Sequence, residues 1–381
     1  MDRIADAAVL GAGIAGASMA KALADRGWET VLIDRRQFPR HKVCGEFLSP
    51  ESDLALRAFG LRDAVESLHP SPIGWTRLYA ANASPLDIPL PGIGRGVSRY
   101  ALDAAIQREA QRAGVQVHTG MTVTKVVPEG DRYRIETLSG SEKRLFRARA
   151  VIAAWGANPR AGLPGYRDSR SASCSYIGVK SHYTGLDAEP AVELYFFPGG
   201  YLGLAPVEDG RVNVAALLER KWVQSVEQSV IGLIEAAVRL HPQLGQRLAS
   251  AVPVPGTQAA VAPVRLSRKP AAWKTIPHAG DAALMIPPLC GDGMSMALRS
   301  AQMCVDYADR FLRGEISLSQ WQHGYEREMM REFRRPLRWG RLIHKLIGIP
   351  GIPALLIGAG HLAPALAYAA VRATRLKETG L

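Results

Sequence analysis

The sequence predicts an α/β protein with two packed parts and a helical C-terminal region. Its 381 residues exceed the usual size of a single hydrophobic core, which indicates more than one part. A glycine-rich turn at residues 11–16 lies between an apolar run and an alanine-rich helical segment. Strand-like segments that suit an antiparallel sheet fill residues 166–264, and helices are expected over residues 311–381.

The N-terminal unit reads as strand, turn, helix and strand. In the pattern GAGIAG, Gly11 allows the turn, Gly13 lets the backbone approach a pyrophosphate, and Gly16 lets the helix pack on the strand. Asp34 ends the second strand at the right distance to accept hydrogen bonds from a ribose. This context predicts a Rossmann-like dinucleotide-binding unit, and the aspartate suits FAD or NAD rather than NADP.

Two later stretches carry related features. Residues 96–114 place Arg99 on a helix that a strand follows, and an apolar strand leads to Gly280 and Asp281 before the helix-opening stretch PLCGDG at 288–293. Together with the N-terminal unit, these resemble the three signatures of the FAD-dependent oxidoreductases related to p-hydroxybenzoate hydroxylase. The geranylgeranyl reductase-like branch, near the flavin-dependent halogenases, is the most similar, over roughly residues 5–310.

The resemblance implies FAD as the cofactor and assigns a role to each signature. The glycine turn and Asp34 would hold the ADP half, Arg99 would lie along the pyrophosphate and ribityl region, and Asp281 would bind a ribityl hydroxyl. The helix after residue 290 would present amides to the flavin ring. Taken alone, Asp281 also suits a helix N-cap and Arg99 a surface ion pair. The cofactor-binding residues implied are Gly11, Gly13, Ala15, Gly16, Asp34, Arg35, Cys44, Gly45, Arg99, Gly156, Gly280, Asp281, Gly291, Gly293 and Met294.

The stretch HKVCGEFLSP at 41–50 resembles the Lys-x-Cys-Gly segment that borders the flavin in the reductase branch. Cys44 is expected as a cavity-lining thiol, with a reactive role as the alternative, because only His41 and Lys42 offer a nearby base or positive field. Ser49 and Pro50 suit the N-cap and first position of the next helix. The catalytic candidates are Cys44, Glu46, Tyr201 and Pro288.

Two departures from the family pattern bear on the chemistry. Trp155 stands where the hydroxylase branch carries an aspartate, so NAD(P)H is expected to dock transiently, or a partner reductase supplies the electrons. Gly203 and Ala205 replace two aromatic residues of the reductase branch, which would leave room for a bulkier substrate. The candidate polar groups for orienting a substrate are His182, Tyr183, Tyr195 and Tyr201.

The C-terminal region combines charge and apolarity. Residues 331–345 contain six Lys and Arg, and residues 346–371 carry no formal charge. That stretch is long enough to span a bilayer, but Pro350, Pro353 and Pro364 argue against a single spanning helix. The alternatives are peripheral contact with a membrane, a lid over a hydrophobic tunnel, and helices that cap the core.

The amino-acid composition limits the kinds of partner and metal site that we expect. The net charge of +12 favours anionic partners, but the basic residues are dispersed and match no nucleic-acid motif. The four scattered cysteines suit neither a disulfide framework nor a zinc site, and no other metal site is expected. Because the N-terminus lacks the pattern of a secretory leader, we expect a cytoplasmic protein.

These features predict an FAD-dependent oxidoreductase and leave its reaction open. The favoured reaction is monooxygenation of a hydrophobic aromatic or polyketide-like molecule through a flavin C4a-hydroperoxide; the alternative is saturation of isoprenoid or polyene double bonds. Halogenation is weaker because nothing marks Lys42 or Lys180 as a tunnel lysine, and a flavin-binding regulatory module is the non-enzymatic option. We expect the FAD-binding part at residues 1–75, 95–165 and 265–310, the substrate part at 76–94 and 166–264, and the C-terminal region at 311–381.

Overall fold

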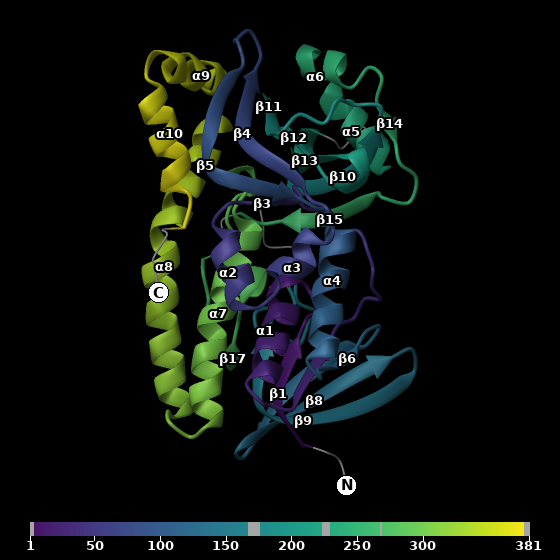
Figure 1. The fold of residues 1–381 in the computed structure, drawn as a ribbon, viewed down its shortest axis with the longest axis vertical. Helices are drawn as coiled ribbons and strands as arrows, with labels where there is room; N and C mark the ends of the chain where they lie inside the picture. Colours follow the sequence, from purple (N-terminus) through teal and green to yellow (C-terminus); the bar gives the residue numbers. More distant parts are fainter. Residues whose placement is uncertain (1–3, 167–175, 223–228, 267–268, 377–381) are drawn as a thin grey trace.

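Two β-sheets, one above the other in Figure 1, dominate the computed structural model. The structure describes residues 4–166, 176–222, 229–266 and 269–376, so Cys174 lies outside the described residues. The α/β class, the two sheets and the C-terminal helices confirm the fold class that the sequence predicts. The expected boundaries of the two parts stay predictions.

The lower sheet has six strands in the order β6-β2-β1-β9-β8-β7. Its first strands β6, β2, β1 and β9 run parallel, and β9, β8 and β7 form an antiparallel meander. The central strands are buried on both faces, as the apolar run of β1 requires. The strands are β1 (Ile4–Leu10), β2 (Thr30–Ile33), β6 (Gln116–His118), β7 (Thr122–Glu129), β8 (Arg132–Ser139) and β9 (Glu142–Ala153).

Three helices pack together beside this sheet: α1 (Ile14–Asp25), α4 (Arg99–Arg112) and α7 (Gly293–Leu312). Alanines on α1 let α4 and α7 come close, and their apolar residues join β1 in the largest buried cluster of the described chain. Helices α1 and α7 begin at the edge of the sheet that faces the second sheet (Figure 1). Both N-termini therefore point toward the space between the sheets.

The upper sheet has nine strands, and one pair departs from the expected antiparallel arrangement. Strand β11 pairs with β4 in parallel, while the other pairs are antiparallel. The chain leaves this sheet after β5, builds α4 and strands β6 to β9 of the lower sheet, and returns at β10, so β11 comes to lie beside β4. The strands are β3 (Phe47–Leu48), β4 (Ser71–Ala80), β5 (Leu86–Gly96), β10 (Tyr176–Thr184), β11 (Ala191–Phe197), β12 (Gly200–Pro206), β13 (Val212–Glu219), β14 (Val252–Pro253) and β15 (Ala259–Val264).

The remaining described elements are short. Two helices follow β13, α5 (Val230–Val238) and α6 (Pro242–Arg247), and they are separate because Pro242 begins a new helix after His241. Helices α2 (Ser52–Ala58) and α3 (Arg62–Glu66) cover the join between the sheets. Strands β16 (Trp273–Lys274) and β17 (Ile276–Pro277) precede the 3₁₀ turns Gly280–Ala282 and Pro288–Cys290.

The C-terminal region is helical. Helix α8 (Leu318–Ile347) runs along one side of both sheets, and α9 (Ile352–Leu362) and α10 (Pro364–Ala373) lie over β4 and β5 (Figure 1). Within the described chain no single helix is long and apolar enough to cross a membrane; α8 and α9 pass by length and composition only as a pair bent by 116°.

Candidate functional site

A cavity of about 1360 Å³ lies between the two sheets, and the sequence-predicted site residues gather around it. It exceeds the roughly 300–1,000 Å³ of an ordinary small-molecule pocket, so it has room for a cofactor and a substrate together. Gly16 is the predicted site residue that does not line it, because its helix packs against β9 behind the turn. The others on its wall are Gly11, Gly13, Ala15, Asp34, Arg35, Cys44, Gly45, Glu46, Arg99, Gly156, Tyr201, Gly280, Asp281, Pro288, Gly291, Gly293 and Met294.

The glycine turn is set by steric contacts within the backbone. Gly11 has φ of +113°, and a Cβ there would lie 2.4 Å from the carbonyl oxygen of Ala154. A Cβ on Gly16 would lie 1.8 Å from the Gly11 carbonyl oxygen. Any side chain at either position would push the turn away from β9, so only glycine keeps α1 aimed at the cavity.

Asp34 holds this turn through hydrogen bonds to backbone amides, and it borders the cavity. Its Oδ2 accepts a hydrogen bond from the Ala12 amide at 2.7 Å, and its Oδ1 accepts one from the Arg36 amide at 2.8 Å. The Gln107 side chain donates to the Ala12 carbonyl from α4 at 3.0 Å, a contact that the sequence does not signal. A carboxylate has about four acceptor positions, so Asp34 retains capacity for ribose hydroxyls.

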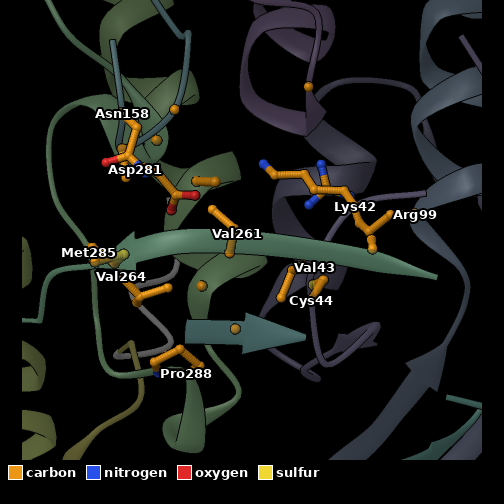
Figure 2. Close-up of a pocket in the computed structure, with 18 of the residues that line it drawn as sticks. Lys42, Val43, Cys44, Arg99, Asn158, Val261, Val264, Asp281, Met285 and Pro288 are labelled. Carbon is orange, nitrogen blue, oxygen red and sulfur yellow. The ribbon is translucent and has the colours of Figure 1, made fainter. Parts of the chain in front are cut away.

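Arg99 and Lys42 place positive charge on one side of the cavity, while Asp281 and Asn158 lie on the other (Figure 2). Arg99 is buried, and its guanidinium donates two hydrogen bonds to Asp103 at 2.9 and 2.7 Å. Burial opposes its charge, but Asp103 and Cys44 together outweigh burial and raise the pKa of Arg99. The charge of Arg99, with burial, lowers the pKa of Lys42. Two cations held this close suit a pyrophosphate.

The entrance to α7 offers backbone donors beside a buried carboxyl group. Gly293 begins the helix, and Asp292 precedes it with its side chain 1 % exposed. Burial raises the pKa of Asp292 to about 7, with Glu51 adding to the effect and Arg375 opposing it. The unpaired amides of the first turn and the positive helix end lie at the cavity wall.

These observations fit FAD. The turn that only glycine allows, the Asp34 acceptor and the two cations suit its ADP and pyrophosphate groups, and the α7 N-terminus suits the electron-rich edge of the flavin ring. The individual contacts assigned to these residues stay predictions.

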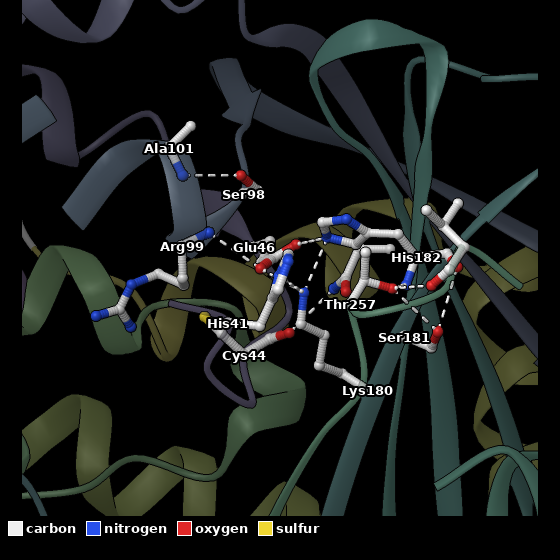
Figure 3. Close-up of polar contacts among 12 residues, drawn as sticks. His41, Cys44, Glu46, Ser98, Arg99, Ala101, Lys180, Ser181, His182 and Thr257 are labelled. Carbon is white, nitrogen blue, oxygen red and sulfur yellow. Dashed lines mark hydrogen bonds and ion pairs between the residues drawn. The ribbon is translucent and has the colours of Figure 1, made fainter. Parts of the chain in front are cut away.

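A buried charged cluster, formed by His41, Glu46, Lys180 and His182, lies next to the cavity (Figure 3). Lys180 Nζ donates to Glu46 Oε1 at 3.0 Å and to His41 Nδ1 at 3.1 Å. His182 Nε2 donates to Glu46 Oε2 at 2.6 Å, and Glu46 Oε1 also accepts the Arg99 amide at 3.0 Å. The Glu46 and Lys180 side chains are both 0 % exposed. The cluster thus joins the 41–46 loop, the start of α4 and strand β10.

The charges in this cluster compensate one another. Burial opposes ionisation of Glu46, but the hydrogen bond from His182 and the charge of Lys180 outweigh it and lower the pKa of the carboxyl group. Burial lowers the pKa of Lys180, and Glu46 partly offsets this. Burial, then the charges of Lys180 and His182, lower the pKa of His41 to about 4. The ligand atoms of His41, Glu46 and His182 lie within 4.8 Å of one another, but the Lys180 ammonium group already stands among them.

Cys44 lies in the loop that this cluster holds. Its carbonyl oxygen accepts a hydrogen bond from the Asn213 side chain at 3.0 Å, and its side chain contacts the Arg99 guanidinium. In the sequence, His41 and Lys42 are the basic residues nearest to Cys44. The contact with Arg99 could not be predicted, because Arg99 lies 55 positions away and helix α4 brings it to the thiol.

The opposite end of the cavity is apolar. Tyr201, Gly203 and Ala205 on β12 line it, and burial raises the pKa of Tyr201 well above its usual value. Pro288 lines the same end from the turn before α7 (Figure 2). The aliphatic lining residues nearby are Val43, Val192, Leu194, Leu217, Val261, Val264, Met285 and Leu289.

The structure differs from the sequence predictions at the start of α2 and at two tyrosines. The helix expected to begin at Ser49 and Pro50 begins at Ser52 instead, because the Ser49 hydroxyl bonds the hydroxyl of Ser295 at 2.6 Å and does not cap α2. Tyr195 does not reach the cavity wall; its hydroxyl donates to Glu193 at 2.6 Å inside the upper part. Tyr183 is buried in the same cluster of the upper sheet, away from the cavity lining.

Comparison with known proteins agrees with this geometry. The family of FAD binding domains matches residues 5–317. Digeranylgeranylglycerophospholipid reductase 2 of Methanopyrus kandleri is 26% identical over 357 residues, which cover 90% of this chain and 87% of that protein. The menaquinone reductase of Mycobacterium tuberculosis is 26% identical over 325 residues, which cover 81% and 78%.

Solved structures share the fold. A geranylgeranyl bacteriochlorophyll reductase-like protein from Thermoplasma acidophilum superposes with a TM-score of 0.75 at 20% identity, over 94% of this chain and 91% of that one. A flavin-dependent brominase superposes with a TM-score of 0.77 at 17% identity, over 98% and 93%. The chain belongs to the family of FAD binding domains, and it is an FAD-dependent oxidoreductase with similarity to geranylgeranyl reductases and halogenases.

Proposed function

We propose that this FAD-dependent oxidoreductase saturates a carbon–carbon double bond in a long apolar molecule of isoprenoid type. The observation that carries the proposal is one cavity with two unlike ends: cations and a glycine turn at the nucleotide end, aliphatic side chains at the other. The reductases of isoprenoid lipids that match along most of this chain support the same reaction. FAD, when bound, supplies the hydride chemistry.

The residues of the chain would bind, exclude water and deliver a proton. The aliphatic wall removes the substrate chain from water, which contributes about 25 cal/mol per Å² of apolar surface buried. Saturation also requires a proton at the second carbon. Cys44 and Tyr201 are lining residues with a proton to give, and they are the candidate donors. Burial raises the pKa of Tyr201, so its hydroxyl stays protonated but is a weak acid, and Cys44 is the preferred candidate.

Glu46 and Pro288 have indirect roles in this proposal. The Glu46 carboxylate accepts bonds from Lys180, His182 and the Arg99 amide, so it holds the loop that carries Cys44. Pro288 shapes the wall ahead of α7. Electrons would come from NAD(P)H or from a partner reductase.

Monooxygenation is the second candidate, because Gly203 and Ala205 on the cavity wall leave space where the reductase branch carries aromatic residues. Halogenation is weaker. Lys180 is fully buried in its pair with Glu46, and Lys42 lies beside Arg99 at the nucleotide end.

Product analysis with and without oxygen tests the proposal. The holoenzyme, a chemical reductant and menaquinone would be incubated under argon and in air. We expect, under argon, a product whose isoprenoid chain has gained two hydrogen atoms, a gain that remains after the quinol ring is reoxidised to the quinone. A product that contains a new oxygen atom and forms only in air would replace reduction with monooxygenation, and strict dependence on halide would replace it with halogenation.

A further inference from the structure

The outward faces of α9 and α10 are apolar and exposed. Leu362 is 90% exposed, Leu366 72% and Leu355 67%, among the highest values for large apolar residues in the described chain. The inner faces of the same helices are packed: Ile357 is 2% exposed and lies in a cluster with Leu86 of β5. The two helices are therefore anchored through one side, and the other side presents leucines to the surroundings.

The charges around these leucines have one sign. Residues 333–375 contain seven Lys and Arg and no Asp or Glu, but one of the seven, Arg375, is buried and paired with Glu51 and Asp292, which leaves six. On α8, Arg334, Arg338 and Lys345 are exposed, at spacings of four and seven residues that place them on one face of the helix. Before residue 333, α8 carries both positive and negative side chains, such as Arg331 and Glu332.

Helices α9 and α10 form a hairpin that carries the exposed leucines, and the end of α8, which leads into this hairpin, adjoins the apolar end of the cavity. Ile347, the last residue of α8, packs against a cluster that includes Leu194 and Tyr201, and both of these line the cavity. His344, one turn earlier, contacts the Tyr176 hydroxyl at 3.2 Å. The end of α8 thus lies between the exposed leucines and the apolar end of the cavity.

We propose that α9, α10 and the second half of α8 form a docking surface for a bilayer that contains anionic lipids. Leu355, Leu362 and Leu366 enter the boundary between headgroups and acyl chains, and the basic residues of α8 contact lipid phosphates. The proposal does not depend on which reaction the flavin site performs. It gives an apolar substrate a route from the bilayer to the cavity.

A second copy of the chain fits this surface poorly. A symmetric dimer through α8–α10 would place the six remaining basic residues of one copy near the same six of the other, with no acidic residue in residues 333–375 to pair with them. Anionic headgroups supply the missing negative charge at high density. Charge complementarity therefore selects the lipid surface.

Vesicle flotation of the yellow holoenzyme tests the docking surface. The probes are vesicles of phosphatidylglycerol mixed with phosphatidylcholine, and vesicles of phosphatidylcholine alone. We expect binding to the anionic vesicles, weakened by added salt, and binding to the neutral ones at least tenfold weaker. The double variant Leu362→Asp/Leu366→Asp should lose at least tenfold in binding to the anionic vesicles.

The matched control is Leu145→Asp/Leu318→Asp, which makes the same chemical change at two exposed leucines far from the hairpin, one on β9 and one at the start of α8. It should bind as the unmodified chain does, and retained flavin colour shows that each variant is folded. Equal loss in both variants, or no binding by the unmodified chain, would overturn the proposal. So would a dimer in solution that Leu362→Asp/Leu366→Asp converts to a monomer, which would assign the face to a second copy.

Discussion

The glycine turn at residues 11–16 and the charged cluster around Glu46 border the same cavity but are built in opposite ways. The turn is local, and its geometry follows from steric limits on neighbouring backbone atoms, as at Gly11 and Gly16. The cluster is non-local: Lys180 and His182 meet Glu46 across 134 and 136 positions, and charge compensation holds them together. A turn fixed by local steric contacts can be predicted from the spacing of its residues. A buried ion pair between distant residues can be identified only from the folded structure.

The largest expected effect is at the turn. Gly11→Ala places a Cβ 2.4 Å from the Ala154 carbonyl oxygen, so the turn must move, and flavin affinity should fall at least tenfold, about 1.4 kcal/mol or more. The measurement is the ratio of flavin to protein absorbance. Gly27→Ala is the control, because Gly27 also has positive φ (+90°) but nothing lies within 4 Å of its Cβ position. If both variants keep their flavin, steric contact does not set the turn.

The next effect is at the cluster. Lys180→Met leaves the Glu46 carboxylate buried without its cation, which should lower the free energy of unfolding by about 3–5 kcal/mol. Urea unfolding of the holoenzyme measures it. Lys125→Met changes an exposed lysine and should stay within about 0.5 kcal/mol.

A double variant sharpens this result. Glu46→Gln in the Lys180→Met background removes the stranded charge, so it should recover part of the lost stability. If Lys180→Met is as stable as Lys125→Met, or if the second substitution adds its own full cost, the two side chains do not act as a compensating pair.

The smallest effect is a pH dependence at the rim of the cluster. The pKa of His41 is about 4 in the folded protein and about 6.5 when unfolded, so folding favours the neutral ring. Its contribution to stability is present above pH about 6.5 and is lost as the pH falls through the folded value. Lys180, His182, Glu46 and Arg211 are the charged groups that act on it.

Melting temperatures at two pH values test this contribution. Between pH about 7 and about 5, the melting temperature should fall less in His41→Asn than in the unmodified chain, because the variant lacks the titrating ring. His323→Asn, at an exposed histidine of α8, should leave the fall unchanged. Equal pH dependence in all three proteins would contradict a neutral His41 in the folded protein.

Much of the fold and the nucleotide end could be predicted from the sequence. Gly11, Gly13 and Asp34 lie at fixed spacings within one strand–turn–helix–strand unit, and each role depends on its immediate neighbours. Asp281 and Gly291 could be placed on the cavity because strand and helix signals flank them. The α/β class follows from the same local patterns.

The rest depends on pairings that no local pattern shows. The parallel contact of β11 with β4 results from the path of the chain between two sheets, and Ser49 fails as a cap because Ser295 takes its hydroxyl. Lys180 and His182 do carry one weak signal: two polar residues at i and i+2 share one face of a strand. Their partner, Glu46, has φ of +56° in an irregular loop, and no sequence pattern predicts this conformation for a glutamate.

A single turnover without oxygen tests the proposed reaction most directly. The flavin of the holoenzyme would be reduced and bleached, freed of excess reductant, and mixed under argon with menaquinol, whose ring cannot accept electrons, or with another isoprenoid lipid that lacks a quinone. The account predicts that the yellow colour returns and that one double bond is saturated for each flavin reoxidised. A flavin that stays bleached with every isoprenoid lipid until air is admitted would contradict it.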